Sequence, residues 1–224
     1  MRAAVYMSTL GCRLNEAELV QWGDAFEARG HTLVSAVPAA NLIVLTTCAV
    51  TAEASRKSRK HASALHRKNP SARLVVTGCM AELEPERAAA LTGVDLVLSN
   101  KRKDELVEEV LSAIDLQTMP ELAMAPESVH VYPETREGAG TSSDLVQLGK
   151  SQERTRAFIK VQDGCRNQCS YCVVTIARGD ERSRSIDELV REIDSLHHKG
   201  VREAVLTGVH LGGYGVDLDT DLST

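Results

Sequence analysis

Aromatic residues and long apolar runs are both scarce in this chain of 224 residues. Aromatic side chains make up 3% of the sequence, so a hydrophobic core must consist mainly of Leu, Val, Ile and Ala. No window reaches the roughly 18 apolar residues that a membrane-spanning helix needs, and the N-terminus lacks the apolar stretch of a secretion signal. We therefore expect a cytoplasmic protein with no membrane partner. The net charge of −5 also argues against a generic nucleic-acid coat, although local basic patches can still bind.

Short apolar runs alternate with helical patterns through the first half of the chain. Runs of buried-strand length lie at 2–9, 41–47, 73–78 and 95–100. Helix-start signals lie between them, with Asn15 and Thr51 as expected caps and Pro85 in an expected first turn. This alternation predicts an α/β fold whose N-terminal domain is a parallel, flavodoxin-like sheet with helices on both faces.

The pattern stops at residue 117 and restarts near residue 157. Three prolines and the segment EGAGTSSD mark the stretch between as a linker. A strand pattern at 157–162, a capping box at Ser185 and Glu188, and a strand pattern at 203–209 then predict the start of a second α/β domain. The expected organisation is a domain at 1–116, a linker at 117–156, and an incomplete domain at 157–224.

Six cysteines fall into two sets of three. Cys12, Cys48 and Cys79, called here the strand-end cysteines, each follow one of the first three predicted strands. Cys165, Cys169 and Cys172, called here the loop cysteines, follow the strand at 157–162 with the spacing C-x3-C-x2-C. Open α/β sheets bind ligands at the carboxyl ends of their strands, and clustered cysteines in a cytosolic chain more often bind metal or act in catalysis than form disulfides. The two sets therefore predict two metal sites with three thiolates each.

Two kinds of metal site are compatible with these sets. A structural zinc site needs a fourth ligand. For the loop cysteines His197, His198 or His210 can supply it, although the first two also suit a helix C-terminus. An iron–sulfur cluster held by three thiolates leaves one iron free for chemistry. For the strand-end cysteines, simple burial without a ligand is a third interpretation. Three cysteines at equivalent strand ends favour a shared ligand.

The segments around the cysteines resemble the radical S-adenosylmethionine (SAM) methylthiotransferases. The loop cysteines, with Tyr171 before the last of them, resemble the radical SAM signature. The strings TLGCRLNEAE, TTCAVT, VTGCMAE, KVQDGC and ARGDERSRS resemble this family, and TGVHLGGYG is most similar to the subgroup that acts on N6-threonylcarbamoyladenosine in tRNA. Thr175-Ile176 and Ser99 depart from the family, which often has Pro-Tyr and Gly there. The family continues through a partial (β/α) barrel and a small RNA-binding domain, so the resemblance implies a fragment.

The resemblance implies a radical mechanism with two [4Fe–4S] clusters and SAM as cofactors. The loop cysteines would hold the cluster that binds and cleaves SAM, with Tyr171 in the cofactor site, and the resulting radical would abstract hydrogen from C2 of adenosine 37. The strand-end cysteines would hold the cluster that carries the sulfur, and a second SAM would supply the methyl group. The implied partners are tRNA, an electron donor and a sulfur source, the last two of unknown identity. Alternative roles are methylthiolation of another tRNA adenosine or of a ribosomal-protein side chain, or metal binding without catalysis.

The most basic stretch of the chain runs from residue 56 to residue 73. It contains seven Lys and Arg residues, two histidines and no acid, and it directly follows the Cys48 loop. A helix of this kind can bind tRNA phosphates, whereas a charged helix face exposed only to solvent is the other interpretation. The predicted tRNA-contact residues are Arg56, Lys57, Arg59, Lys60, Arg67 and Lys68.

Overall fold

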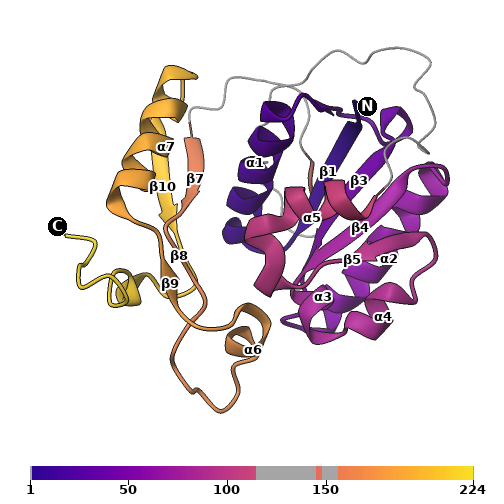
Figure 1. Ribbon diagram of the computed structural model, residues 1–224. Helices are drawn as coiled ribbons and strands as arrows, with labels where there is room; N and C mark the ends of the chain where they lie inside the picture. The colour runs from indigo at the N-terminus through magenta and orange to yellow at the C-terminus, as the bar shows by residue number, and fades with distance from the viewer. Residues whose placement is uncertain (1, 115–144, 148–155, 224) are drawn as a thin grey trace. The chain divides into compact units, whose positions relative to one another are not determined.

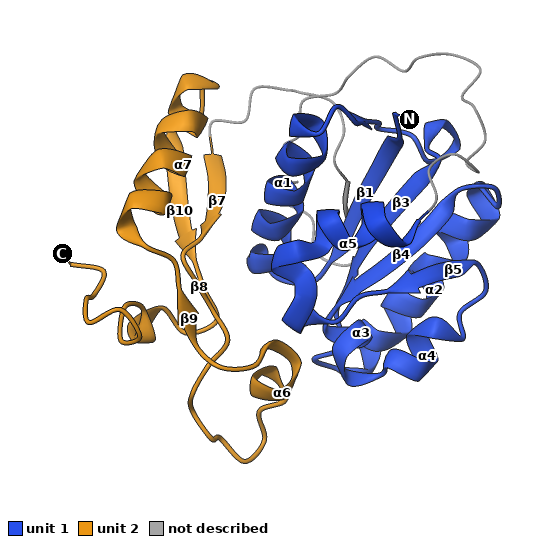
Figure 2. Ribbon diagram, viewed as in Figure 1, with its two compact units in different colours: residues 1–151 blue, residues 152–224 orange. Residues whose placement is uncertain are grey.

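The structure, a computed structural model, describes residues 2–114, 145–147 and 156–223 (Figure 1). The chain divides into two compact units, residues 1–151 and 152–224 (Figure 2). Most of the expected linker, residues 117–156, lies outside the described residues. Among the helices that the structure describes, none is long and apolar enough to span a membrane.

The first unit is built on a parallel sheet with the strand order β2-β1-β3-β4-β5. These strands are β1 (Ala4–Leu10), β2 (Thr32–Leu33), β3 (Leu42–Thr47), β4 (Arg73–Gly78) and β5 (Val94–Val97). A sixth strand, β6 (Leu145–Gln147), pairs antiparallel with the end of β1 and falls within the expected linker. The parallel order is that of flavodoxin-like folds, so the predicted fold class is confirmed.

Helices cover both faces of this sheet, as the apolar strands predict (Figure 1). They are α1 (Arg13–Ala28), α2 (Ala52–Lys68), α3 (Cys79–Leu83), α4 (Pro85–Ala89) and α5 (Leu106–Ala113), with 3-10 helices η1 (Val37–Ala39) and η2 (Asn100–Glu105). One core cluster joins Val5 and Val44 to Phe26 of α1 and Val110 of α5. The other joins alternate strand residues to α2, α3 and α4. Each central strand therefore buries both of its faces.

The helix starts show which capping predictions hold. The Thr51 hydroxyl caps α2 by accepting a hydrogen bond from the backbone N–H of Ala54 at 3.1 Å, and Pro85 stands in the first turn of α4. The prediction that Asn15 caps α1 is wrong, because the helix begins at Arg13. The Asn15 amide instead donates to the carbonyl of Leu10 at 3.1 Å. This buried side chain therefore supplies a hydrogen bond to the last carbonyl group of β1.

The second unit contains a β7–α7–β10 arrangement in which the two strands pair in parallel. Its elements are β7 (Arg156–Lys160), β8 (Gln162–Asp163), α6 (Val174–Arg178), β9 (Arg182–Ser183), α7 (Ile186–His198), β10 (Glu203–Thr207) and the 3-10 helix η4 (Leu211–Gly213). The predicted capping box of Ser185 and Glu188 is present at the start of α7. Strands β8 and β9 pair antiparallel and close the base of the segment that carries the loop cysteines.

Candidate metal sites

The strand-end cysteines lie at the carboxyl edge of the parallel sheet. Cys48 and Cys79 directly follow Thr47 and Gly78, which are paired residues of the neighbouring strands β3 and β4. Cys12 follows the end of β1 by two residues, and β1 pairs with β3 on its other side. Parallel strands end at a common edge, so the topology brings the three thiols to one side of the sheet, as predicted from the sequence.

Two glycines allow this close approach. A Cβ atom at Gly11 would lie 3.3 Å from the Cβ atom of Cys48, so the Cys12 loop passes directly over Cys48. Gly78 has a φ of +92°, and a Cβ there would lie 2.4 Å from the carbonyl oxygen of Thr47. Because only glycine fits this conformation and spacing, it permits β4 to turn into α3 beside β3. The turn places Cys79 at the first position of α3.

Buried amide side chains lie beside two of these thiols. Asn15 Oδ1 is 3.6 Å from Cys12 Sγ, and Asn100 Nδ2 is 4.0 Å from Cys79 Sγ. Both asparagines are at most 2% exposed. The sequence predicts a site role for neither residue: its pattern favours Asn15 as a helix cap, and Asn100 stands at the end of an expected strand with no signal of its own.

The third thiol is held through its backbone. The backbone N–H of Cys48 donates to Ser58 Oγ at 3.1 Å, and the Ser58 hydroxyl donates to the carbonyl of Cys48 at 2.8 Å. Ser58 is fully buried on α2. The Cys48 loop is therefore tied to a helix on the face of the sheet opposite α1.

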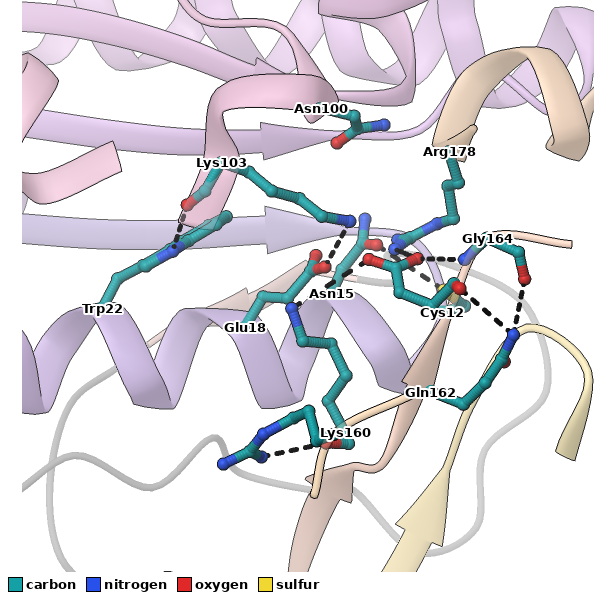
Figure 3. Close-up of polar contacts among 12 residues, drawn as sticks. Cys12, Asn15, Glu18, Trp22, Asn100, Lys103, Lys160, Gln162, Gly164 and Arg178 are labelled. Carbon is teal, nitrogen blue, oxygen red and sulfur yellow. Dashed lines mark hydrogen bonds and ion pairs between the residues drawn. The ribbon is translucent and has the colours of Figure 1, made fainter. Parts of the chain in front are cut away.

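A buried ion pair fixes η2 against α1. Lys103 Nζ lies 2.8 Å from Glu18 Oε1, and both side chains are 1% exposed (Figure 3). The indole N–H of Trp22 also donates to the Lys103 carbonyl at 3.0 Å. Since Asn100 lies one turn before Lys103 in η2, these contacts set the position of the amide beside Cys79.

A hydrogen-bond network supports the base of the loop that carries the loop cysteines. The Asp163 carboxylate accepts hydrogen bonds from Arg178 at 3.0 Å and from the backbone N–H of Gly164 at 2.8 Å. Gln162 donates to the carbonyl of Gly164 at 2.7 Å (Figure 3). Asp163 and Arg178 are both buried, so the ion pair joins the start of the loop to the helix at its end. In the sequence, Gln162, Asp163 and Arg178 carry only a family resemblance, and no individual role is predicted for them.

The loop is also closed by its backbone. Gly164 has a φ of +69°, and a Cβ there would lie 1.9 Å from the carbonyl oxygen of Asp180. The N–H of Cys165 donates to the carbonyl of Gly179 at 3.1 Å, and the N–H of Cys172 donates to that of Cys169 at 3.0 Å. Cys169 is exposed, the other two loop cysteines are half-buried, and the neighbouring Tyr171 is 90% exposed. The loop is therefore held at its base, and its cysteines range from half-buried to exposed.

The donor sets suit iron–sulfur clusters. The six cysteines all lie within the described residues, and none of them forms a disulfide. Among the residues that the structure describes, no three Cys, His, Asp or Glu side chains are placed to hold a single metal ion. In an iron–sulfur cluster held by three thiolates, each thiolate binds a different iron and one iron stays open. The Nδ1–H of His198 donates a hydrogen bond to the Asp194 carbonyl at 2.7 Å in the last turn of α7, as expected of a helix-end residue.

The basic stretch forms α2 and the start of β4, and only part of it is available for a ligand. Arg56 is paired with Glu53 at 2.9 Å, and Arg59 donates to Ser55 Oγ at 2.6 Å and lies 3.8 Å from Glu84. The prediction that no carboxylate compensates these cations is therefore wrong. The stretch itself contains no acid, but Glu53 and Glu84, which lie outside it in the sequence, pair with its cations in the folded protein.

The remaining cations of α2 lie on its exposed side. Lys60, Arg67 and Lys68 are exposed and form no ion pair within the described ranges. His61 adds no charge at neutral pH, since burial and the nearby Lys68 lower its pKa to about 4. Its ring nitrogen is hydrogen-bonded to Ser8 Oγ at 2.9 Å, which turns this histidine toward the sheet.

Comparisons with known proteins match both units. Residues 4–99 match the family described as "Uncharacterized protein family UPF0004", and residues 159–215 match the radical SAM superfamily. The chain is 36% identical to the threonylcarbamoyladenosine tRNA methylthiotransferase MtaB of Aquifex aeolicus, over 98% of this chain and 51% of that protein. It is 37% identical to the MtaB of Chlamydia pneumoniae, over 92% and 43%, and 29% identical to the ribosomal protein uS12 methylthiotransferase RimO of Chloroflexus aurantiacus, over 95% and 48%.

The chain spans about half the length of the curated relatives it matches. The two matched segments contain all six cysteines, with the strand-end cysteines in the first and the loop cysteines in the second. This arrangement and the similarity over nearly the whole chain confirm the resemblance inferred from the cysteine-bearing strings. Nearly the whole chain is therefore similar to radical SAM methylthiotransferases, and each of its two units carries a family match of its own.

Proposed function

We propose that this protein is a transferase that methylthiolates tRNA at C2 of N6-threonylcarbamoyladenosine 37, using SAM and two [4Fe–4S] clusters. The observation that carries this proposal is the pair of three-thiol sets, one at the carboxyl edge of the sheet and one in the closed loop. The names of several relatives supply the reaction and the nucleoside. The reaction also requires an electron donor and a sulfur source, and it takes place in the cytoplasm.

The protein's own residues act by placement. SAM and the clusters, when bound, supply the radical and sulfur chemistry. The loop cysteines hold one cluster, and the buried Asp163–Arg178 pair keeps their loop in shape. Tyr171, exposed beside Cys172, is assigned to the SAM site. The strand-end cysteines hold the other cluster, at an edge supported by Asn15, Ser58 and Asn100.

The test of this proposal is metal content. After anaerobic reconstitution we expect about eight irons and eight acid-labile sulfides per chain, since each cluster contributes four of each. About four irons would contradict the two-cluster mechanism and leave one of the two sets without a cluster. Zinc with little iron would contradict the enzymatic proposal, because both sets would then be structural.

A second candidate function is methylthiolation of a ribosomal protein. The observation that favours this second function is the similarity of the chain to RimO proteins, at 29–32% identity. The exposed cations of α2 favour the tRNA reaction instead, because a line of cations is suited to a phosphate backbone. Binding measurements can separate the two functions.

The predicted tRNA contact is tested by charge reversal on α2. We expect Lys60→Glu combined with Arg67→Glu to weaken tRNA binding and to reduce the slope of log affinity against log salt by about 1 for each phosphate that the variant no longer binds. Arg59 is excluded from this test because its contacts with Ser55 and Glu84 are structural. The measurement is a fluorescence titration with tRNA at several salt concentrations.

The control is Arg29→Glu, at the C-terminal end of α1 on the opposite face of the sheet, which makes half the change in net charge of the double variant. This variant changes the net charge in the same direction but should leave the salt slope unaltered. An equal loss of slope in the control would show a general charge effect, and an unaltered slope in the α2 variant would show that α2 is only a solvated face.

A further inference from the structure

Three threonines form a row across the sheet just before the strand-end cysteines. Thr9 of β1 is paired with Thr46 of β3, and Thr46 is paired with Thr77 of β4. This threonine row, Thr9, Thr46 and Thr77, lies three, two and two residues before Cys12, Cys48 and Cys79. Two residues of strand correspond to about 6–7 Å. The row therefore borders the candidate cluster site along its full width.

The three hydroxyls lie on one face of the sheet. Side chains alternate along a strand, so Thr9 shares its face with Val5 and Met7, and Thr46 shares its face with Val44. Val5, Met7 and Val44 belong to the core cluster covered by α1 and α5. Asn15 of α1 and Asn100 of η2, the residues beside Cys12 and Cys79, belong to elements on this same side.

The hydroxyls of the threonine row are buried without a partner. The three residues are at most 1% exposed, and their Oγ1 atoms have no hydrogen-bond partner within the described part of the chain. A buried hydroxyl without a hydrogen bond costs free energy, because it loses its hydrogen bonds to water and gains none in the protein. By contrast, Thr47, the next residue of β3 and on the opposite face, donates its hydroxyl to the carbonyl of Thr77. Three adjacent unpaired hydroxyls point to a polar group that they contact together.

We propose that the threonine row donates hydrogen bonds to the sulfur atoms of the cluster held by the strand-end cysteines and raises its reduction potential. This inference rests on the proposed function, because it requires that cluster. Hydrogen bonds to cluster sulfurs stabilise the reduced, more negatively charged state. In this proposal the three threonines touch the cofactor's sulfur atoms directly and leave the iron ligands unchanged.

The inference is tested in a protein that holds one cluster. In a parent protein with Cys165→Ala, Cys169→Ala and Cys172→Ala, only the strand-end cysteines can bind iron, and about four irons are expected. We then expect each of Thr9→Val, Thr46→Val and Thr77→Val to shift the ratio of oxidised to reduced cluster several-fold toward the oxidised form at a fixed potential. A tenfold shift corresponds to about 59 mV for a one-electron couple. The readout is a redox titration followed by electron paramagnetic resonance.

Stability without iron separates the proposal from simple packing. Without the cluster we expect the three Val variants to melt at the same temperature as the parent or higher, since each replaces an unpaired buried hydroxyl by an apolar group. Thr47→Val is the matched control, and it should melt lower and leave the potential unaltered. Thr46→Ser keeps the hydroxyl and should retain the potential of the parent.

Three results would overturn this inference. An unaltered potential in the Val variants would show that the hydroxyls do not contact the cluster. Lower melting temperatures without iron, as in the control, would show that the hydroxyls already have a partner such as internal water. A parent that binds no iron would overturn the proposed function itself, and this result is distinct because it is seen before any threonine is changed.

Discussion

Replacing Cys79 by alanine is expected to reduce the methylthiolated nucleoside to an undetectable level. In the proposed function its thiol is one of three protein ligands of the strand-end cluster, so its loss would leave two of the four irons held by protein. The same result is expected for each of the other five cysteines. The measurement is mass spectrometry of nucleosides from digested tRNA after reaction with the reconstituted protein.

Iron content shows which site each cysteine serves. Cys79→Ala and Cys169→Ala should each lose about half of the iron while both lose the product, because the two sets act in one reaction. Ser112→Ala, on an exposed part of α5, is the control and should retain both iron and product. Product formation by a variant of a strand-end cysteine would remove that residue from the proposed site.

Replacing Lys103 by methionine is expected to destabilise the first unit by about 3–5 kcal/mol, because it breaks a buried ion pair and removes the cation that lies beside the Glu18 carboxylate. Both side chains of the pair are 1% exposed. The expected result is a lower midpoint of denaturation by urea. Since η2 carries Asn100, iron occupancy at the strand-end site should fall in the same variant.

Two further variants test this explanation. Lys103→Met combined with Glu18→Leu removes both charges and should recover much of the lost stability. Arg29→Met removes one partner of an exposed pair with Glu108 and should cost less than about 1 kcal/mol. A double variant as unstable as the single one would mean that the ion pair is not the cause.

The sequence was sufficient for the parts of the fold that depend on local pattern. The strand at 73–78 was predicted at its observed bounds, and the caps at Thr51 and Ser185 were identified, because a hydroxyl three residues before a free N–H is a local signal. Strand β2 was missed because its two residues carry no periodicity. Strand β6 was missed because its pairing with β1 is a contact between distant parts of the chain.

The candidate sites show the same division between local and distant information. That the strand-end cysteines lie at one edge of the sheet follows from their positions at the ends of three predicted parallel strands. The roles of Asn15 and Asn100 did not, since an amide beside a sulfur atom depends on how α1 and η2 pack. Arg59 was grouped with the tRNA-contact residues because Glu84, which lies 25 positions later in the chain, carries no sequence signal of the pairing.

The pairing of β6 with β1 affects where the first unit can be divided. Strand β6 covers the backbone of Ser8, Thr9 and Leu10 on the edge that β2 leaves open, directly before the Cys12 loop. A shortened protein that stops at residue 116 would expose these N–H and C=O groups, and an open strand edge invites pairing with another chain. Isolation of this unit in a soluble, monomeric state is therefore expected to require the chain through residue 147 at least.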